Sequence, residues 1–125
     1  MPEPCVFCTA SADEAWILTD FVVAVPHTHP LAPCHIVVAP RRHVASFYEL
    51  DVQEQQLLWA IVLELRRRIS SALRTDGFGV GFADGEGSWH THIHVVPRVP
   101  GEHLALPRDV EWVNVDEDTA PPSRT

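Results

Sequence analysis

Three histidines, His90, His92 and His94, alternate with Thr91, Ile93 and Val95 inside the chain. Strict alternation predicts a β-strand. In a strand the three imidazoles share one face, about 6.6–7 Å apart from one to the next, and the intervening side chains face a core. Crowded imidazoles resist joint protonation, so some should be neutral near pH 7. A neutral imidazole can be a nucleophile, a base or a metal ligand. A solvated strand that carries histidines is the alternative.

Two cysteines form a C-x-x-C motif, Cys5-Val6-Phe7-Cys8, near the N-terminus. The spacing suits two thiolate ligands of one tetrahedral zinc ion, whose other ligands could be histidines further along the chain. A thioredoxin-like redox motif would follow a strand in a βαβ pattern, and no strand is expected before Cys5. Two inert, buried thiols are the remaining alternative.

A glycine-rich segment, Asp84-Gly85-Glu86-Gly87-Ser88-Trp89, leads directly into the histidine stretch. Backbone N–H groups in such a loop can form an anion-binding concavity. The loop could also simply join two strands. Its position against three histidines favours the anion site.

The composition argues against membrane-spanning proteins, secreted proteins and nucleic-acid binders. At 125 residues the chain is expected to form one domain. No apolar run is long enough for a membrane span and no signal peptide is apparent, so we expect a cytoplasmic protein without membrane contact. A formal net charge of −8 argues against nucleic acid as a partner. No lysine is present, which leaves arginine, histidine and backbone N–H groups to bind anions and excludes Schiff-base chemistry.

Short β-branched and aromatic runs predict the strands of one sheet. They cover residues 15–18, 21–25, 35–39, 78–83 and 90–98, and residues 110–115 add either a last strand or a subunit contact. A proline-rich loop at 26–33 separates the second strand from the third. A short helical turn is expected over 44–50. We expect residues 116–125 to form a disordered tail.

A long helix is predicted to start at Asp51, because Asp51 and Glu54 have the spacing of a capping box. Apolar residues recur at steps of three and four down to Arg74 and mark one buried stripe. The stripe consists of Leu58, Ile61, Val62, Leu65, Ile69, Ala72 and Leu73. Gly77 is the expected helix stop.

The run from His90 to Arg98 resembles the signature of the histidine triad (HIT) superfamily of nucleotide hydrolases and transferases. The stretch from Pro30 to Val44 resembles the family's loop, single histidine, strand and helix entry, and the order of elements is also similar. The resemblance covers roughly residues 5 to 100. It implies an α+β, HIT-like fold over residues 1–115, with an antiparallel sheet of about five strands, one long helix and one short helix.

The resemblance also implies roles for individual residues. His92 would attack the α-phosphorus of a small-molecule nucleotide and carry a covalent nucleotidyl group, while His35 and His94 would donate hydrogen bonds to phosphate oxygens. In the zinc-bearing branch of the family, a structural zinc would be held by four residues of this chain. These are Cys5, Cys8, His43 and His90. The family also implies a homodimer.

The chain departs from the family pattern around the substrate. Glu86 stands where many members have Gln, and Gly87 where they have Ser or Thr, so Ser88 is a candidate substitute donor and Glu86 a candidate acid or base. His27 replaces an acidic ribose-binding residue, and Phe82 lies where an asparagine is often found. With Gly85, these residues form the candidate substrate-binding set. His27 could instead be merely exposed.

Two other functions compete with the nucleotidyl-histidine enzyme. Histidines on a strand, together with a distant histidine, could hold a catalytic zinc ion that activates water. A non-catalytic nucleotide-binding module would use the same pocket without turnover. Removing the metal would stop the zinc-dependent reaction but not the histidine reaction. A His92→Ala variant would abolish turnover in the enzyme, whereas a binding module would keep its affinity and has no turnover to lose.

Overall fold

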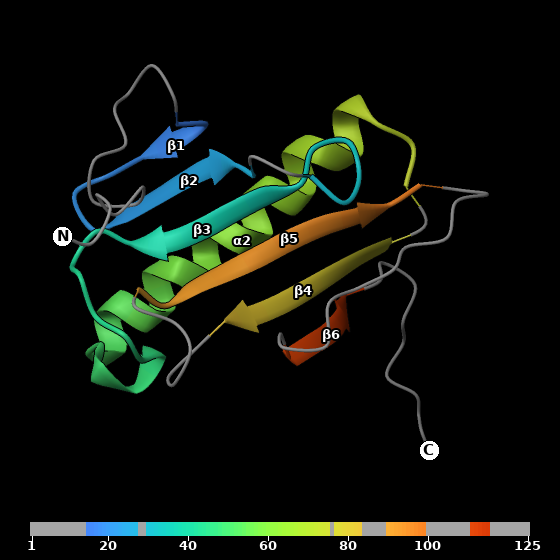
Figure 1. Cartoon of the computed structure of the whole chain (residues 1–125). Helices are drawn as coiled ribbons and strands as arrows, with labels where there is room; N and C mark the ends of the chain where they lie inside the picture. The colour runs from blue at the N-terminus through green and yellow to red at the C-terminus, as the bar shows by residue number, and fades with distance from the viewer. Residues whose placement is uncertain (1–14, 28–29, 76, 84–89, 100–110, 116–125) are drawn as a thin grey trace, which may run out of the picture.

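In the part of the chain that the structure describes, a six-stranded antiparallel sheet packs against one long helix (Figure 1). The computed structural model describes residues 15–27, 30–75, 77–83, 90–99 and 111–115. The strands are β1 (Ile17–Leu18), β2 (Val22–Pro26), β3 (Ile36–Pro40), β4 (Gly77–Ala83), β5 (His92–Arg98) and β6 (Glu111–Val115). Their order in the sheet is β1-β2-β3-β5-β4-β6. The predicted α+β class is confirmed, and residues 110–115, for which the sequence predicts either a last strand or a subunit contact, contain the sixth strand, β6.

The helix α2 (Val52–Ala72) begins with the predicted capping box. Asp51 accepts a hydrogen bond from the Glu54 backbone N–H at 2.8 Å, and Glu54 accepts one from the Asp51 N–H at 3.1 Å. The helix ends at Ala72 instead of Arg74, because Leu73 is extended (φ −142°, ψ 134°) and packs against the core. Gly77 is not the helix stop but the first residue of β4, with a φ of 148° that favours glycine.

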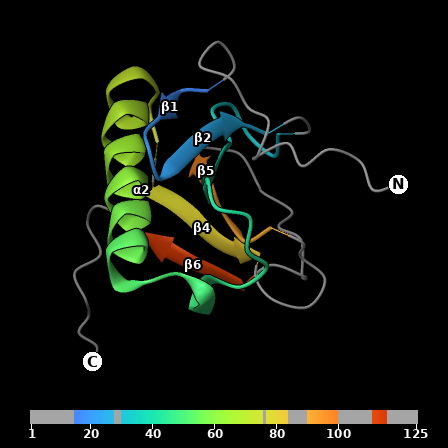
Figure 2. The ribbon, with the colours of Figure 1, turned by 90° about the vertical axis from the view of Figure 1, so that its left-hand side faces the viewer.

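Helix α2 covers one face of the sheet, as Figure 2 shows from the side. The hydrophobic core lies between the two. Leu58, Val62, Leu65 and Ile69 of the predicted stripe are fully buried, whereas Ala72 is exposed. They pack against Ile36 and Val38 of β3, Phe78 and Val80 of β4, and Ile93 and Val95 of β5. This burial fixes the inward face of each central strand.

The opposite face of the sheet carries the histidines of β5. Because Ile93 and Val95 face the helix, His92 and His94 project from the other side. His94 is paired with Val37 of β3 on one side and with Gly81 of β4 on the other. Since Gly81 has no side chain, the ring of His94 has room beside it on this face.

Strand β5 starts at His92, two residues later than the alternation predicts. The Thr91 N–H bonds to the Val44 carbonyl at 2.8 Å, and the Thr91 hydroxyl donates to the Ala83 carbonyl at 3.3 Å. The first bond holds residue 91 against the segment after β3 and the second holds its side chain against the end of β4, so residue 91 lies outside the β5 ladder. His90 therefore leaves the row formed by His92 and His94, and it is fully buried.

A short 3₁₀ helix, η1 (Phe47–Glu49), lies within the predicted helical turn and connects β3 to α2. Ser46 caps it by accepting a hydrogen bond from the Tyr48 N–H at 3.1 Å. Among the described residues, no helix has the length and apolar character that crossing a membrane requires.

Candidate functional site

Four histidines gather on the sheet face opposite α2. His94 is central, with ring centroids 4.9 Å from His92, 5.2 Å from His35 and 5.4 Å from His27. The rings of His27 and His35 stack at 4.4 Å with an interplanar angle of 16°. Residues from β5, from the position just after β2 and from the position just before β3 thus meet at one place.

The loop before β3 fixes the proton on His35. The Leu31 backbone N–H donates to His35 Nδ1 at 3.0 Å, and the His27 N–H bonds to the His35 carbonyl at 2.9 Å. Because Nδ1 is an acceptor, a neutral His35 carries its proton on Nε2. That Nε2 atom lies 3.0 Å from His94 Nδ1, so His35 donates to His94.

The same reasoning extends to His94. Its Nδ1 accepts from His35, so a neutral His94 carries its proton on Nε2. The chain of donors runs from the Leu31 backbone through His35 to His94. A neutral His94 in this chain therefore has its donor N–H at Nε2.

His92 is in the opposite tautomer. Its Nδ1 lies 2.9 Å from the His90 carbonyl oxygen, which can only accept, so Nδ1 carries the proton. The lone pair of a neutral His92 is then on Nε2. The site therefore contains a nucleophilic nitrogen next to a hydrogen-bond donor, which is the pair that attack on a phosphoryl group requires.

Burial keeps these rings neutral. Desolvation, with the charges at His92, His35 and His27, lowers the pKa of His94 to about 3. Desolvation and the charge at His27 lower the pKa of His35 to about 4. The pKa of His92 is also lowered, first by desolvation and then by His27, against the opposing hydrogen bond to the His90 carbonyl. At neutral pH the three rings are uncharged, as the tautomer assignment assumes.

A cavity of about 500 Å³ adjoins His27 and His35. Its other lining residues come from the position before β1, from the end of β2, from the loop between β2 and β3 and from the start of β3: Trp16, Pro26, Pro30, Ala32, Pro33, Cys34 and Ile36. The wall is mainly apolar and includes one indole ring. A planar apolar group could enter it while an attached anionic group meets the histidines.

A second pair of histidines lies behind the first cluster. His90 Nδ1 and His43 Nδ1 are 3.2 Å apart, and the rings meet edge to face at 4.8 Å. His90 Nε2 donates to the Pro40 carbonyl at 2.7 Å, which leaves its Nδ1 unprotonated when the ring is neutral. Desolvation lowers the pKa of His90 and favours that neutral form. The pair can offer two nitrogen ligands to one metal ion.

The structure brings together six of the candidate residues in two groups, and it places Phe82 elsewhere. Phe82 is paired with Ile93 on the face toward α2 and packs against Phe47 with centroids 6.2 Å apart. It therefore does not line the histidine cluster. The remaining candidates lie outside the described residues: Cys5, Cys8, Gly85, Glu86, Gly87 and Ser88.

The sequence does not predict three main-chain groups of the site: the Leu31 N–H and the carbonyls of Pro40 and His90. They set the tautomers, yet a backbone group has no signal in residue type. Trp16 was also missed, although an aromatic residue in a predicted edge strand is a detectable candidate for a cavity wall.

The HIT domain family matches residues 10–101, which include both histidine groups. The chain belongs to the HIT family. An uncharacterized HIT-like protein of Saccharolobus solfataricus is 31% identical over 101 residues, 74% of this chain and 73% of that protein. The AP-4-A phosphorylase of Mycobacterium tuberculosis is 36% identical over 65% of this chain but only 44% of its own length. A bifunctional bis(5'-adenosyl)-triphosphatase/adenylylsulfatase of Arabidopsis thaliana is 28% identical over 71% of this chain and 52% of its own.

Solved structures of HIT proteins share the fold. A Zn-bound histidine triad family protein from Mycobacterium smegmatis matches with a TM-score of 0.71 and 25% identity, over 84% of this chain and 82% of that one. A HIT family protein from Bacillus anthracis matches with a TM-score of 0.70 and 17% identity, over 86% and 85%. These matches confirm the predicted HIT-like fold.

Proposed function

We propose that this HIT protein is a nucleotide hydrolase or transferase. It acts at the α-phosphate of a nucleoside phosphoanhydride, phosphoramidate or similar conjugate, through a covalent intermediate on His92. The observation that carries the proposal is the 2.9 Å bond from His92 Nδ1 to the His90 carbonyl, which leaves the lone pair on Nε2. HIT relatives that are named as a phosphorylase, a triphosphatase and an adenylylsulfatase support the reaction class.

In the first step the Nε2 lone pair of His92 attacks phosphorus, and the bond to the leaving group breaks with its electron pair. The nucleotidyl-imidazole is cationic, because Nδ1 keeps its proton, and the His90 carbonyl stabilises that charge. The Nε2–H of His94 donates to a non-bridging phosphate oxygen. Water or another acceptor then attacks phosphorus and gives its proton to Glu86, the proposed base, or to solvent. The P–N bond breaks, and His92 regains its lone pair.

His35 acts through His94 in this geometry. Its Nε2–H is directed to His94 Nδ1, so it orients and polarises the donor. His27 lines the cavity and stacks on His35, and we assign it to substrate binding. Gly85, Gly87 and Ser88 stay in the proposed substrate-binding set, with Glu86 as the proposed acid or base.

We also propose a structural zinc ion bound by Cys5, Cys8, His43 and His90. Two nitrogens that ligate one tetrahedral zinc are about 3.3 Å apart, and the two Nδ1 atoms are 3.2 Å apart. The Pro40 carbonyl holds the outer N–H of His90, as second partners of zinc-bound histidines usually do. The two described ligands, His43 and His90, fit the metal, which would fasten the N-terminal segment to the chain just before β5.

A second set of ring nitrogens, from His27, His35 and His94, lies within 4.8 Å. It fits a metal less well. The Leu31 N–H occupies His35 Nδ1, so Nε2 carries a proton, and a metal ion at that nitrogen would have to displace both hydrogen bonds of His35. We therefore assign this set to the phosphate.

A homodimer is the third part of the proposal. Val52, Trp59 and Leu63 of α2 are 68%, 40% and 45% exposed, and their spacing places them along one side of the helix. Val52 and Trp59 also line a hollow of about 500 Å³, together with Phe47, Gln55, Gln56 and Phe82. Exposed apolar patches of this kind mark interaction sites, and we propose a second copy of this chain as the occupant. Sedimentation equilibrium of the full chain and of Trp59→Glu, which we expect to be monomeric, tests it.

The function is tested by turnover of a panel of dinucleoside polyphosphates, nucleoside phosphoramidates and adenylyl sulfate. We expect hydrolysis of at least one class, a loss of about a thousandfold or more in His92→Ala, and no change in Tyr48→Phe, whose side chain is exposed. A chelated, still folded protein should remain active. Loss of activity on chelation would favour the metal-activated water, and nucleotide binding without turnover would favour the non-catalytic module.

A further inference from the structure

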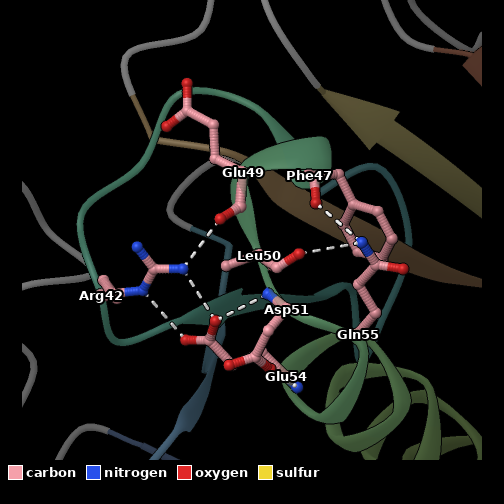
Figure 3. A network of polar contacts seen from close by, with 7 residues as sticks. All are labelled: Arg42, Phe47, Glu49, Leu50, Asp51, Glu54 and Gln55. Carbon is pink, nitrogen blue, oxygen red and sulfur yellow. Dashed lines mark hydrogen bonds and ion pairs between the residues drawn. The ribbon is translucent and has the colours of Figure 1, made fainter.

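A buried carboxylate at the start of α2 connects the helix cap to the segment that carries His43. Glu54 is only 7% exposed and accepts two hydrogen bonds from Arg42, from Nε at 3.1 Å and from Nη2 at 2.8 Å (Figure 3). It also accepts the capping bond from the Asp51 N–H at 3.1 Å. One side chain therefore serves two purposes, since the capping box alone needs neither Arg42 nor a charge.

The guanidinium of Arg42 is held on several sides. Besides its fork on Glu54, Nη2 donates to the Glu49 carbonyl at 2.9 Å (Figure 3). Bidentate arginine–carboxylate pairs fix direction as well as distance. The hydrogen bond from Arg42, followed by that from the Asp51 N–H, lowers the pKa of Glu54, so the pair stays ionised at neutral pH. Because the Arg42 side chain is half exposed, we expect its ion pair with Glu54 to add little to the free energy of unfolding and to serve mainly to orient the two residues.

His43 lies between this anchor and a second one. The next residue, Val44, is buried and accepts the Thr91 N–H at 2.8 Å. On one side of His43 the chain is thus fixed to α2 through Glu54, and on the other to the segment just before β5. These two anchors direct the exposed imidazole of His43 toward His90, with the two Nδ1 atoms 3.2 Å apart.

We propose that Glu54, acting through Arg42, is a positioning residue that holds His43 against His90 as a metal-ligand pair. The inference builds on the zinc site under "Proposed function" and adds a residue of α2 to its support. An ordinary capping glutamate would stabilise the helix and leave the His43–His90 contact unchanged. The two roles therefore make different predictions.

Two variants separate the roles. Glu54→Gln keeps a capping oxygen, because glutamine also serves at this position of a capping box, but it removes the charged fork on Arg42. Asp51→Ala removes the reciprocal bond of the box and leaves the Arg42–Glu54 pair in place. Arg42→Gln and the Arg42→Gln/Glu54→Gln double variant complete a cycle, in which the second change should add little to the first if the two residues act together.

The first measurement is Zn²⁺ affinity of the full chain by competition with a chromogenic chelator. We expect Glu54→Gln and Arg42→Gln to weaken binding about tenfold, at the lower end of what is lost when the residues that orient a metal ligand are removed, and Asp51→Ala to change it less than twofold. Equal affinities in Glu54→Gln and the wild type would overturn the metal role of Glu54.

The second measurement needs no metal. In protein with ¹³C-labelled histidine, cross-relaxation between the His43 and His90 rings should be strong in the wild type and in Asp51→Ala, and weak in Glu54→Gln. A contact that persists in Glu54→Gln contradicts the positioning role. If the wild type binds no Zn²⁺, the proposed zinc site and the metal role of Glu54 both fail, whereas this comparison still decides whether Glu54 positions His43.

Discussion

His35 Nε2 lies 3.0 Å from His94 Nδ1, and a backbone N–H on the far side of His35 fixes the direction of that hydrogen bond. His94 is thereby kept as a donor at Nε2. In the proposed reaction, the two histidines act in series on the same phosphate oxygen, and His92 supplies the nucleophile. Each partner in the series can be removed separately.

The series predicts graded effects at position 35. In His35→Gln the side-chain amide N–H can reach the place of Nε2–H, whereas His35→Ala leaves His94 without its donor. We expect kcat/KM to fall in the order wild type, Gln, Ala, with a loss of about a hundredfold for Ala. Steady-state kinetics on the best substrate of the panel measures it. Equal losses in both variants would contradict a role for the hydrogen bond.

The lowered pKa values predict that acid destabilises the fold. Between pH 6.5 and 4 the unfolded chain protonates His35 and His94, while the folded chain, with pKa values of about 4 and about 3, does not. Unfolding then takes up protons, so the free energy of unfolding falls as pH falls, by about 3 kcal/mol for His35 alone. Urea titrations at several pH values measure the slope. His94→Asn should make it shallower, and an unchanged slope would argue against a depressed pKa at His94.

His27 should influence its neighbours through charge. The charge at His27 contributes to the lowered pKa values of His35, His92 and His94, in each case after desolvation. In His27→Gln we therefore expect the pKa of His94 to rise while it stays below 6.5, because burial still acts. Histidine ring NMR titrations of the variant and the wild type give the direction. A fall, or no change, would contradict the proximity of the two rings.

Two leucines of α2 test the core. Leu65 is fully buried against the sheet and Leu63 is 45% exposed. Leu65→Ala should lower the free energy of unfolding by about 2–5 kcal/mol, whereas Leu63→Ala should lower that of the isolated subunit by less than about 1 kcal/mol. Chemical denaturation at low protein concentration compares them. Similar losses would mean that α2 is rotated relative to this structure.

Residue periodicity was enough to predict the main parts of the fold. Alternation placed Ile93 and Val95 in the core, the period of the helix identified four buried residues of α2, and Asp51 with Glu54 gave its start. The first and last residues of the helix and the strands were less predictable. The helix ends at Ala72 because Leu73 is extended and packs against the core. His90 lies outside β5 because the Thr91 N–H bonds to Val44. Both ends depend on tertiary contacts.

The candidate site was predictable where side-chain type matters. Resemblance brought His43 and His90 into one set, and the structure places their nitrogens 3.2 Å apart. The resemblance predicts Phe82 in the pocket, where members of the family often have asparagine, but strand alternation turns it toward α2. Backbone groups such as the Leu31 N–H determine which nitrogen carries each proton, and only coordinates reveal them.

The central claim is that His92 Nε2 forms a covalent bond to phosphorus. The most direct measurement is peptide mass mapping of protein quenched at alkaline pH during turnover, since a phosphorus–nitrogen bond of this kind is labile in acid. We predict one nucleotidyl group on the peptide that contains His92, located on that residue by fragmentation and absent from His92→Ala. Turnover with no adduct on any histidine, or with an adduct on His35 or His94, would contradict the account.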